Sequence, residues 1–504
     1  RLLRYREEEE DIQIPEHFFL PTPESFADET LPPSTDDLEK GEANSVVPPI
    51  AQRARDDEKD KMFVSSLLMV YTVTCYIGSS LYAASAKDIT GIFGVSDVVS
   101  ALGLSLYVLG YGVAPLLFGP LSEIPTIVRV PIFSVTYIIL VLLSLAAALV
   151  NVFAGLLVLR FLLDFFAAPA LANAGASYGD FFSARAMPYV ICFWGGGATI
   201  SSALGPLMAG FAVQAEGWRW SSWILFWFSA PVLILVLLFL PETSPDTILL
   251  RRARRLRALT GRTDLRSASE IKQAKMSPIQ VAYDALIKPW QINFLDPAVL
   301  FSTIYTALTY GLYYSFFESF PLVYQGIYGF DLGQLGLTFL SLLIGLLVGV
   351  HIYCGYFYFI GDPAMSKMDS VPPEARLPPG LGGSIVIPIG LFLFAWTARI
   401  SIHWSVSLIG AGISLCGLFI IVQCMLCYLP FTYPYYSGSL FAANGFARST
   451  FAAGAILFAN PLFKRLGIGG GVSLLAGLAV LCIGGMFGIY HFGATLRKRS
   501  RFAA

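Results

Sequence analysis

Hydrophobic residues form long runs from about Met62 almost to the C-terminus, separated by short polar segments. Each run is long enough to cross a bilayer, which takes about 20 apolar residues in a helix. The runs show no strict alternation of polar and apolar positions, so they predict helices rather than strands. We place twelve spans at 62–84, 97–118, 128–150, 153–177, 187–213, 220–241, 297–322, 335–360, 381–399, 404–429, 434–459 and 468–493.

A long basic loop divides these spans into two sets of six. Its arginine run, from Arg251 to Arg257, is too charged to lie in hydrocarbon. The sequence therefore predicts an all-α integral membrane protein of twelve transmembrane helices in two six-helix bundles. We expect five regions: a disordered acidic cytosolic tail (1–61), an N-terminal bundle (62–241), a basic cytosolic loop (242–295), a C-terminal bundle (296–493) and a basic cytosolic tail (494–504).

Composition and charge support a membrane protein and give its orientation. Hydrophobic residues make up 56% of the chain and charged residues 13%, against roughly 25% charged residues in soluble domains. Lysines and arginines gather on one side of the alternating spans, in the loop at Arg129, the central loop and the C-terminal tail. The positive-inside rule makes this side cytoplasmic. We therefore expect a multi-pass protein of the plasma membrane with both termini cytoplasmic. The chain starts at Arg1 without a methionine, and we expect residues to precede it.

The loop between the second and third spans carries a glycine, an acid four residues later and a closing base. Gly119 can end the second helix with a tight turn. The Glu123 carboxylate can then contact the N-terminus of a neighbouring helix, where negative charge is favoured. Arg129 closes the loop, and Asp180 lies near the inner end of the fourth span. These four residues predict a charged cytoplasmic gate. The alternative is an ordinary polar turn.

Small residues surround a proline in the fifth span, from Ala203 to Gly210. Pro206 removes a helix hydrogen bond, and Gly205 and Gly210 let a neighbouring helix approach closely. The segment predicts a packing seam that can move without unpacking. A static packing contact is the simpler interpretation.

The loop from Gly119 to Arg129 resembles that of the major facilitator superfamily, in the form found in fungal twelve-span drug:proton antiporters of the benomyl/methotrexate-resistance type. Leu240-Pro241-Glu242-Thr243-Ser244 and the following arginines are similar to the same family. Val128 stands where the family usually has glycine. The resemblance covers about 62–501. It implies the major facilitator fold and makes Gly205, Pro206 and Gly210 the family's antiport hinge.

Two ionisable residues lie four apart in the fourth span. Arg160 and Asp164 should share one helix face. The resemblance assigns proton transfer to an arginine at the position of Arg160, whereas the family usually has Gln-Gly where this chain has Leu163-Asp164. Two interpretations stay open: Asp164 carries the proton, with Arg160 tuning it, or the two form a static salt bridge.

Aromatic residues concentrate in the seventh span. We expect these and three polar residues to line the substrate path, because large π surfaces with few fixed polar groups suit varied flat molecules. Packing or lipid contact is the alternative for the aromatics, and an interfacial position for Glu318. The predicted path residues are Tyr310, Tyr313, Phe316, Phe317, Glu318, Asn444 and Arg448.

Other chemistries lack the residues they need. Cys424 and Cys427 form a CxxC pair inside a span, without the loop and partner ligands of a zinc site, so we expect buried thiols. No Gly-x-x-x-x-Gly-Lys-Ser/Thr loop occurs, which argues against an ATP-driven pump. A net charge of −1 lacks the excess of basic residues that is typical of nucleic-acid-binding proteins. We expect no enzyme activity, metal or cofactor, and a monomer.

Together these features predict proton-coupled efflux of small amphipathic organic compounds through alternating access. The cargo is an exogenous drug or toxin, or the cell's own secondary metabolite; the sequence leaves both open. The alternative is an uptake carrier or facilitator for a small organic solute on the same fold. The Gly205-Pro206 seam argues against that alternative.

Overall fold

The computed structural model describes residues 50–123, 129–183, 185–262, 265–267, 269–271, 287–368, 371–433 and 437–500. The chain divides into two compact units. One comprises Arg1–Phe63 and Ser244–Ser277, and the other comprises Val64–Thr243 and Pro278–Ala504. Every regular element in the described ranges is a helix.

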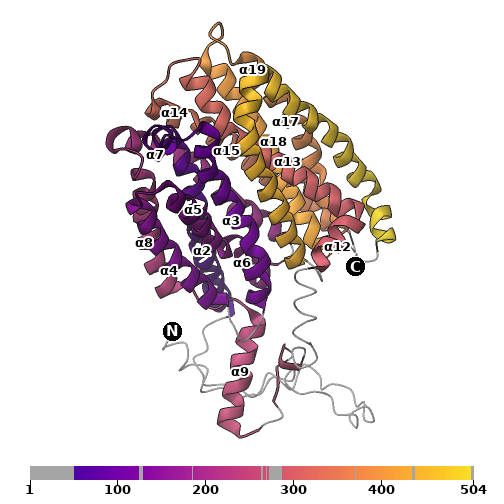
Figure 1. The fold of residues 1–504 in the computed structure, drawn as a ribbon. Helices are drawn as coiled ribbons and strands as arrows, with labels where there is room; N and C mark the ends of the chain where they lie inside the picture. The colour runs from indigo at the N-terminus through magenta and orange to yellow at the C-terminus, as the bar shows by residue number, and fades with distance from the viewer. Residues whose placement is uncertain are drawn as a thin grey trace. The chain divides into compact units, whose positions relative to one another are not determined.

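The larger unit contains two sets of helices. The first set, drawn in indigo to magenta in Figure 1, is α2 (Ile50–Phe93, from Val64 on), α3 (Asp97–Glu123), α4 (Arg129–Leu149), α5 (Phe153–Ala167), α6 (Pro169–Phe181), α7 (Met187–Glu216) and α8 (Trp220–Phe239). The second set is α12 (Lys288–Leu295), α13 (Pro297–Phe320), α14 (Leu332–Thr338), α15 (Leu340–Tyr356), α16 (Asp362–Met365), α17 (Pro378–Thr397), α18 (Trp404–Thr432) and α19 (Ser437–Arg499). Short π-helices, η2 (Pro321–Gln325) and η3 (Phe357–Gly361), and a 3₁₀ turn, η4 (Pro373–Arg376), join them.

Each of the twelve predicted spans is helical. Nine helices in the described ranges are long and apolar enough to cross a membrane. The predicted fourth span is divided between α5 and α6, and the seventh coincides with α13, which is rich in Tyr, Thr and Ser. The eleventh and twelfth spans run together in α19, where Gly467 has a φ of 72° between two helical stretches. This left-handed φ suits glycine and turns the chain between the spans.

Pro169 explains why the fourth span is not one continuous helix, as the sequence analysis expected. Proline has no backbone N–H and occupies the first turn of α6. α5 therefore ends at Ala167, although Ala168 keeps helical φ and ψ and its N–H still donates to the carbonyl oxygen of Asp164 at 3.0 Å. The helix of the fourth span is thus interrupted one turn beyond Asp164.

The regions predicted as a disordered tail and a polar loop also contain helix. α2 begins at Ile50, before the predicted start at 62, so residues 50–61 are helical and the predicted disorder is wrong there. Residues 1–49 lie outside the described ranges. The loop contains α9 (Pro245–Thr260), which buries Leu250 and Ala253 and ends at Gly261 with a φ of 67°. Within this smaller unit, Arg257 and Glu270 form an ion pair at 2.7 Å.

The larger unit carries many large apolar side chains on its surface. Leu142, Trp227 and Ile344 are more than 60% exposed, and Leu481 is 75% exposed. A soluble protein rarely exposes so many contiguous apolar groups. These faces are suited to lipid contact.

The largest contacts between the two sets of helices join α3 with α19 and α7 with both α14 and α15; smaller ones join α7 with α18 and α6 with α19. We call the end of the larger unit where α3 ends and α7 begins the loop end, and the opposite end the far end. Along α3, the Ser105 hydroxyl donates to the carbonyl oxygen of Ala453 at 2.9 Å. A Cβ added at Gly112 would lie 2.5 Å from the Cβ of Ser449. The backbones therefore approach closely at this contact.

Candidate transport cavity and buried charges

A cavity of about 420 Å³ lies between the two sets of helices in the larger unit. Except for α2 and α4, which contribute one residue each, the lining helices contribute residues three or four apart, which is the stripe that one face of a helix presents. On α7 the stripe runs from Ile191 through Trp194 and Ala198 to Ser202. The facing stripe on α18 is Leu415, Leu418, Phe419, Val422, Gln423, Leu426 and Pro430.

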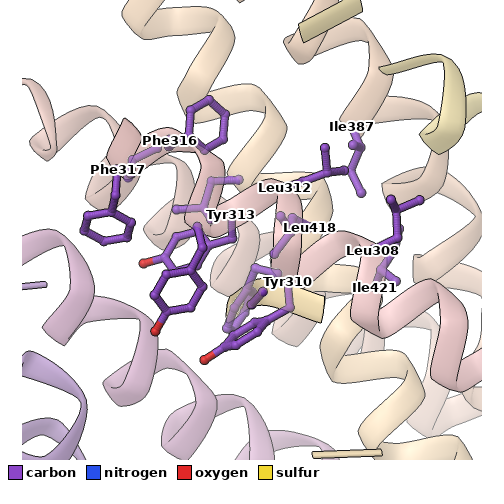
Figure 2. Close-up of a cluster of buried hydrophobic side chains, with 14 of the residues drawn as sticks. Leu308, Tyr310, Leu312, Tyr313, Phe316, Phe317, Ile387, Leu418 and Ile421 are labelled. Carbon is purple, nitrogen blue, oxygen red and sulfur yellow. The ribbon is translucent and has the colours of Figure 1, made fainter. Parts of the chain in front are cut away.

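Tyrosines form much of the cavity wall. Tyr76 on α2 and Tyr111 on α3 face Tyr310 and Tyr313 on α13. The rings of Tyr111 and Tyr310 meet edge to face, with centroids 6.1 Å apart. In Figure 2 the hydroxyls of Tyr310 and Tyr313 lie on the side of α13 away from Leu308 and Ile387. Tyr310 and Tyr313 thus lie on the cavity wall, and their role in a substrate path stays a prediction.

The cavity ends before the next turn of α13. Phe316 packs against Phe394 of α17, and Phe317 packs against Phe339 between α14 and α15. Among the described residues, neither these phenylalanines nor Glu318 lines this cavity, and their role in a substrate path stays a prediction. Glu318 instead accepts a hydrogen bond from Asn460 Nδ2 at 3.3 Å.

Asn444 and Arg448, predicted for the substrate path, lie one turn apart on α19, and both line the cavity. The Asn444 amide donates to Thr306 Oγ1 on α13 at 2.8 Å. The Arg448 guanidinium lies over the ring of Tyr310, 4.7 Å from its centroid. Its Nε is fully buried and makes no hydrogen bond of ordinary geometry with the residues that the structure describes.

Arg160 is buried among neutral groups of α2 and α3. Its Nε donates to the carbonyl oxygen of Gly103 at 3.1 Å, and Nη2 donates to that of Gly78 at 2.9 Å. The guanidinium also lies over the rings of Tyr107 and Tyr82, 4.2 and 4.5 Å from the centroids. Two carbonyls and two aromatic faces thus stabilise the buried cation.

Asp164 lies one helical turn beyond Arg160 and is only 4% exposed. Within the described ranges no ion pair joins the two side chains, and no hydrogen bond reaches the Asp164 carboxyl group. The static salt bridge considered from the sequence is therefore not present in this conformation. A buried carboxyl group without such partners is strongly disfavoured in its charged form.

One face of α3 connects these buried charges with the cavity. Gly103, Tyr107, Tyr111 and Pro115 follow at four-residue intervals and so share that face. Gly103 and Tyr107 contact Arg160, whereas Tyr111 and Pro115 line the cavity. Neither Arg160 nor Asp164 lines it, so the charge site and the cavity are separate places joined by one helix.

Two of the four residues predicted for a gate, Arg129 and Asp180, form an ion pair at the loop end. The Arg129 guanidinium donates to Asp180 Oδ2, and both residues border the cavity. Gly119 does not end the helix as expected, because α3 continues to Glu123. The Glu123 side chain lies outside the described part of the chain.

The sequence analysis missed the acid that meets the start of α4. Glu242 Oε2 accepts a hydrogen bond from the Val130 N–H at 3.3 Å. A carboxylate is favoured at a helix N-terminus. The Leu240-Pro241-Glu242 segment thus contributes a helix-capping contact at the loop end. The sequence analysis used this segment only as evidence of family resemblance.

The predicted hinge residues on α7 face two different partners. A Cβ at Gly205 would lie 1.9 Å from Ser80 Oγ of α2, within the first set of helices. A Cβ at Gly210 would lie 2.7 Å from the carbonyl oxygen of Leu332 in α14, in the second set. A Cβ at Gly336 would in turn lie 2.6 Å from the carbonyl oxygen of Pro206. The Pro206–Gly210 turn is therefore a contact between the two sets.

The far end of this contact region is closed by polar links. Tyr314 OH donates to Ser79 Oγ at 3.4 Å, and the Gly333 N–H donates to Gln214 Oε1 at 2.9 Å. Lys464 pairs with Asp97 at 2.7 Å. In the other direction the cavity extends to the exposed Gly179 at the loop end.

Cysteines show no metal-site geometry in the described residues. No group of three or more His, Cys, Asp or Glu residues there could hold a metal ion. Cys424 and Cys427 are fully buried free thiols, as predicted. Cys192 on α7 and Cys354 on α15 place their sulfurs 3.6 Å apart across the two sets of helices.

Comparisons with known proteins agree with this architecture. The profile described as Major Facilitator Superfamily matches residues 68–455. The chain is 44% identical over 444 residues to the MFS-type transporter pyvG of Aspergillus violaceofuscus, covering 88% of this chain and 82% of that protein. It is 34% identical to the cycloheximide resistance protein of Candida maltosa, covering 100% and 96%. The structure of the proton:xylose symporter XylE has a TM-score of 0.62 at 10% identity, covering 86% of this chain and 96% of that one.

Proposed function

We propose that this chain, which belongs to the major facilitator superfamily, exports small amphipathic organic compounds in exchange for protons. The observation that carries the proposal is the tyrosine-lined cavity between the two sets of helices, with a buried carboxyl group near it on a separate helix. A cavity of mixed aromatic and apolar walls suits ligands of varied shape. Named relatives include the cycloheximide resistance protein of Candida maltosa and the fluconazole resistance protein 1 of Saccharomyces cerevisiae, which favours outward transport of drugs.

In this mechanism two helix bundles rock about the cavity. One bundle comprises residues 62–241 and the other comprises residues 296–493. Asp164 takes up and releases the proton, and Arg160 adjusts its affinity for it. The Pro206–Gly210 turn is the hinge at the far end, and the Arg129–Asp180 pair is part of the gate at the loop end. Tyr310, Tyr313, Asn444 and Arg448 contact the cargo. The chain thus acts as a monomeric carrier rather than an enzyme.

The proposed membrane orientation follows from charge. The arginine-rich loop after α8 and the basic C-terminal segment put the loop end in the cytoplasm. The far end then faces outside the plasma membrane. In this orientation the described conformation is closed to the outside, and its cavity extends toward the cytoplasm.

The test is transport by purified protein in proteoliposomes loaded with a fluorescent hydrophobic compound. We expect an imposed pH gradient to drive efflux well above the rate without a gradient. Efflux that occurs equally with and without the gradient would contradict antiport and support the facilitator alternative. Protein-free liposomes carrying the same gradient measure the passive leak.

A further inference from the structure

The cavity contains a positive charge that none of its described lining residues balances. Three of these described residues are charged: Arg129, Asp180 and Arg448. Arg129 and Asp180 form an ion pair, so their charges cancel. Arg448 forms no ion pair with any described Asp or Glu. The described lining residues therefore carry one net positive charge, located at Arg448.

The surroundings of Arg448 partly stabilise that charge but do not satisfy it. Its guanidinium lies 4.7 Å from the Tyr310 centroid and 6.0 Å from that of Tyr111. Aromatic faces attract a cation but accept no strong hydrogen bond from it. The buried Nε has no acceptor among the described residues. An arginine presents five donors in a planar fork, which matches the two oxygens of a carboxylate.

The polar groups next to Arg448 make only loose contacts. The Tyr111 hydroxyl interacts with the Arg448 guanidinium, Ser449 and Tyr310, and the Tyr313 hydroxyl interacts with Ser202. None of the hydroxyls of Tyr111, Tyr310 and Tyr313 makes a hydrogen bond of ordinary geometry within the described ranges. All three belong to residues that line the cavity. Buried polar groups in native proteins are usually satisfied, so a cluster of unsatisfied ones around a cavity points to a ligand that satisfies them.

We propose that the cavity selects aromatic weak acids and binds them as anions, with Arg448 holding the carboxylate. The tyrosine hydroxyls donate further hydrogen bonds to its oxygens, and the aromatic body lies among Trp194, Phe419 and Tyr310. This inference rests on the proposed function, because it names the cargo class of that same cavity. Cationic amphiphiles are disfavoured, since they would meet a like charge.

Equilibrium binding tests this selectivity with two ligands of nearly equal size. The carboxylate 1-pyrenebutyrate and its neutral primary amide, 1-pyrenebutyramide, are titrated into purified protein in detergent at pH 7.5. A charge-assisted hydrogen-bond pair corresponds to roughly a 10- to 100-fold preference. We therefore expect the wild type to prefer the carboxylate by that factor and Arg448→Gln to reduce the preference to near 1. Arg448→Lys should recover part of it.

Two controls separate charge recognition from other effects. Arg399→Gln removes an exposed arginine outside the cavity and should keep the wild-type preference. For each ligand, the affinity of the wild type is also divided by that of Arg448→Gln. Unequal partition of the two ligands into detergent cancels in this ratio. Measurable binding of the amide by Arg448→Gln reports a folded cavity.

The inference is overturned if the wild type shows no preference for the carboxylate, or if Arg448→Gln retains it. Binding is measured without a pH gradient, so it does not depend on proton coupling. Gradient-driven efflux of the neutral amide without carboxylate preference would overturn only the anion site. Carboxylate preference without gradient-driven efflux of either compound would overturn antiport and leave the anion site standing.

Discussion

Arg160 is a buried cation held by carbonyl oxygens and tyrosine rings instead of a carboxylate. Its neighbours explain how the site is built. A Cβ at Gly78 would lie 2.1 Å from Tyr107 Oη, and one at Gly103 would lie 2.3 Å from the Tyr82 ring. The two glycines therefore give the tyrosines space to flank the guanidinium. In the proposed mechanism, Asp164 would therefore gain and lose a proton without breaking a salt bridge.

We predict that Asp164→Asn abolishes the gradient-driven component of efflux. Asparagine keeps the size of the side chain but cannot bind and release a proton. In the proteoliposome assay, efflux with an imposed pH gradient should fall to about the rate without one. Binding of a cavity ligand should stay measurable, because Asp164 does not line the cavity.

Glu318→Gln is the matched comparison for Asp164→Asn, because Glu318 is another acid within a predicted span but lies outside the cavity and hydrogen-bonds Asn460. We expect Glu318→Gln to keep the gradient response. Gradient-driven efflux that survives in Asp164→Asn and disappears in Glu318→Gln would transfer the proton role to Glu318.

Helix α7 of the first set contacts α14 and α15 of the second set. This contact has to change when the two sets of helices rock against each other. At the far end, Gly210 and Gly336 let the backbones of α7 and α14 approach closely. Toward the loop end, Tyr189 OH donates to Asp362 Oδ2 at 2.9 Å. Small residues allow such a contact to shift without leaving unfilled volume.

Gly210→Ala should impair transport through this contact. The added Cβ would lie 2.7 Å from the carbonyl oxygen of Leu332, and a backbone atom cannot easily move away. Overpacking of this kind costs roughly 1–3 kcal/mol, which corresponds to about a 5- to 150-fold change in an equilibrium between conformations. We expect a severalfold lower efflux rate in proteoliposomes.

Gly196→Ala is the matched control on the same helix. Its Cβ would have only Val350 Cγ2 near it, at 3.8 Å, which is an ordinary contact. Efflux at the wild-type rate is expected for this variant. Equal losses in both variants would mean that helix stiffening, and not the α7–α14 contact, limits transport.

The thiols of Cys192 and Cys354 offer a second test of movement in the same contact. An oxidant such as copper–phenanthroline would take two electrons from the two thiols, releasing two protons and forming one disulfide between α7 and α15. We expect gradient-driven efflux to fall to near the passive leak after oxidation and to recover with dithiothreitol.

The variants Cys192→Ser and Cys354→Ser should be insensitive to the oxidant. The cross-link itself is identified by mass spectrometry of a non-reduced digest. If the cross-link forms quantitatively and efflux continues unchanged, α7 and α15 do not separate at this level during transport.

The positions of the spans were largely predictable from sequence, because a helix in lipid must be about 20 residues long and apolar throughout. The direction of individual side chains was harder to predict. Tyr313 and Phe316 are one turn apart on α13, yet only Tyr313 lines the cavity. The difference arises because Phe394 of α17 packs against Phe316. Such a tertiary contact cannot be predicted from the composition of one helix. Similarly, the contact of Glu242 with α4 joins residues 112 positions apart.

At the scale of the whole molecule, proposed alternating access requires two conformations of similar free energy. The described conformation has its far end closed by contacts between the two sets of helices, including Lys464–Asp97, Gln214–Gly333 and Tyr314–Ser79. Each is individually weak, so together they can bias the equilibrium without fixing it.

The Lys464–Asp97 pair allows this balance to be changed by charge alone. Both side chains are about half exposed, 55% and 53%, so the pair contributes only about 0.2–1 kcal/mol. That range corresponds to a factor of roughly 1.4 to 5 in the ratio of closed to open far ends. Lys464→Asp should remove the attraction and introduce repulsion, lowering the closed population by at least that factor. Exchanging the two charges in Asp97→Lys/Lys464→Asp should restore it.

Spin labels on the exposed far-end helix termini would measure this ratio by electron spin resonance distance distributions, at low and high salt. High salt should reduce the difference between Lys464→Asp and the wild type, because screening weakens interactions between exposed charges. A distance distribution that is identical in all variants would mean that the apolar and backbone contacts of α7 with α14 alone hold the far end closed. In that case the Gly210→Ala variant, and not the charge variants, would shift the distribution, and the hinge would be the main determinant of which side of the membrane the cavity faces.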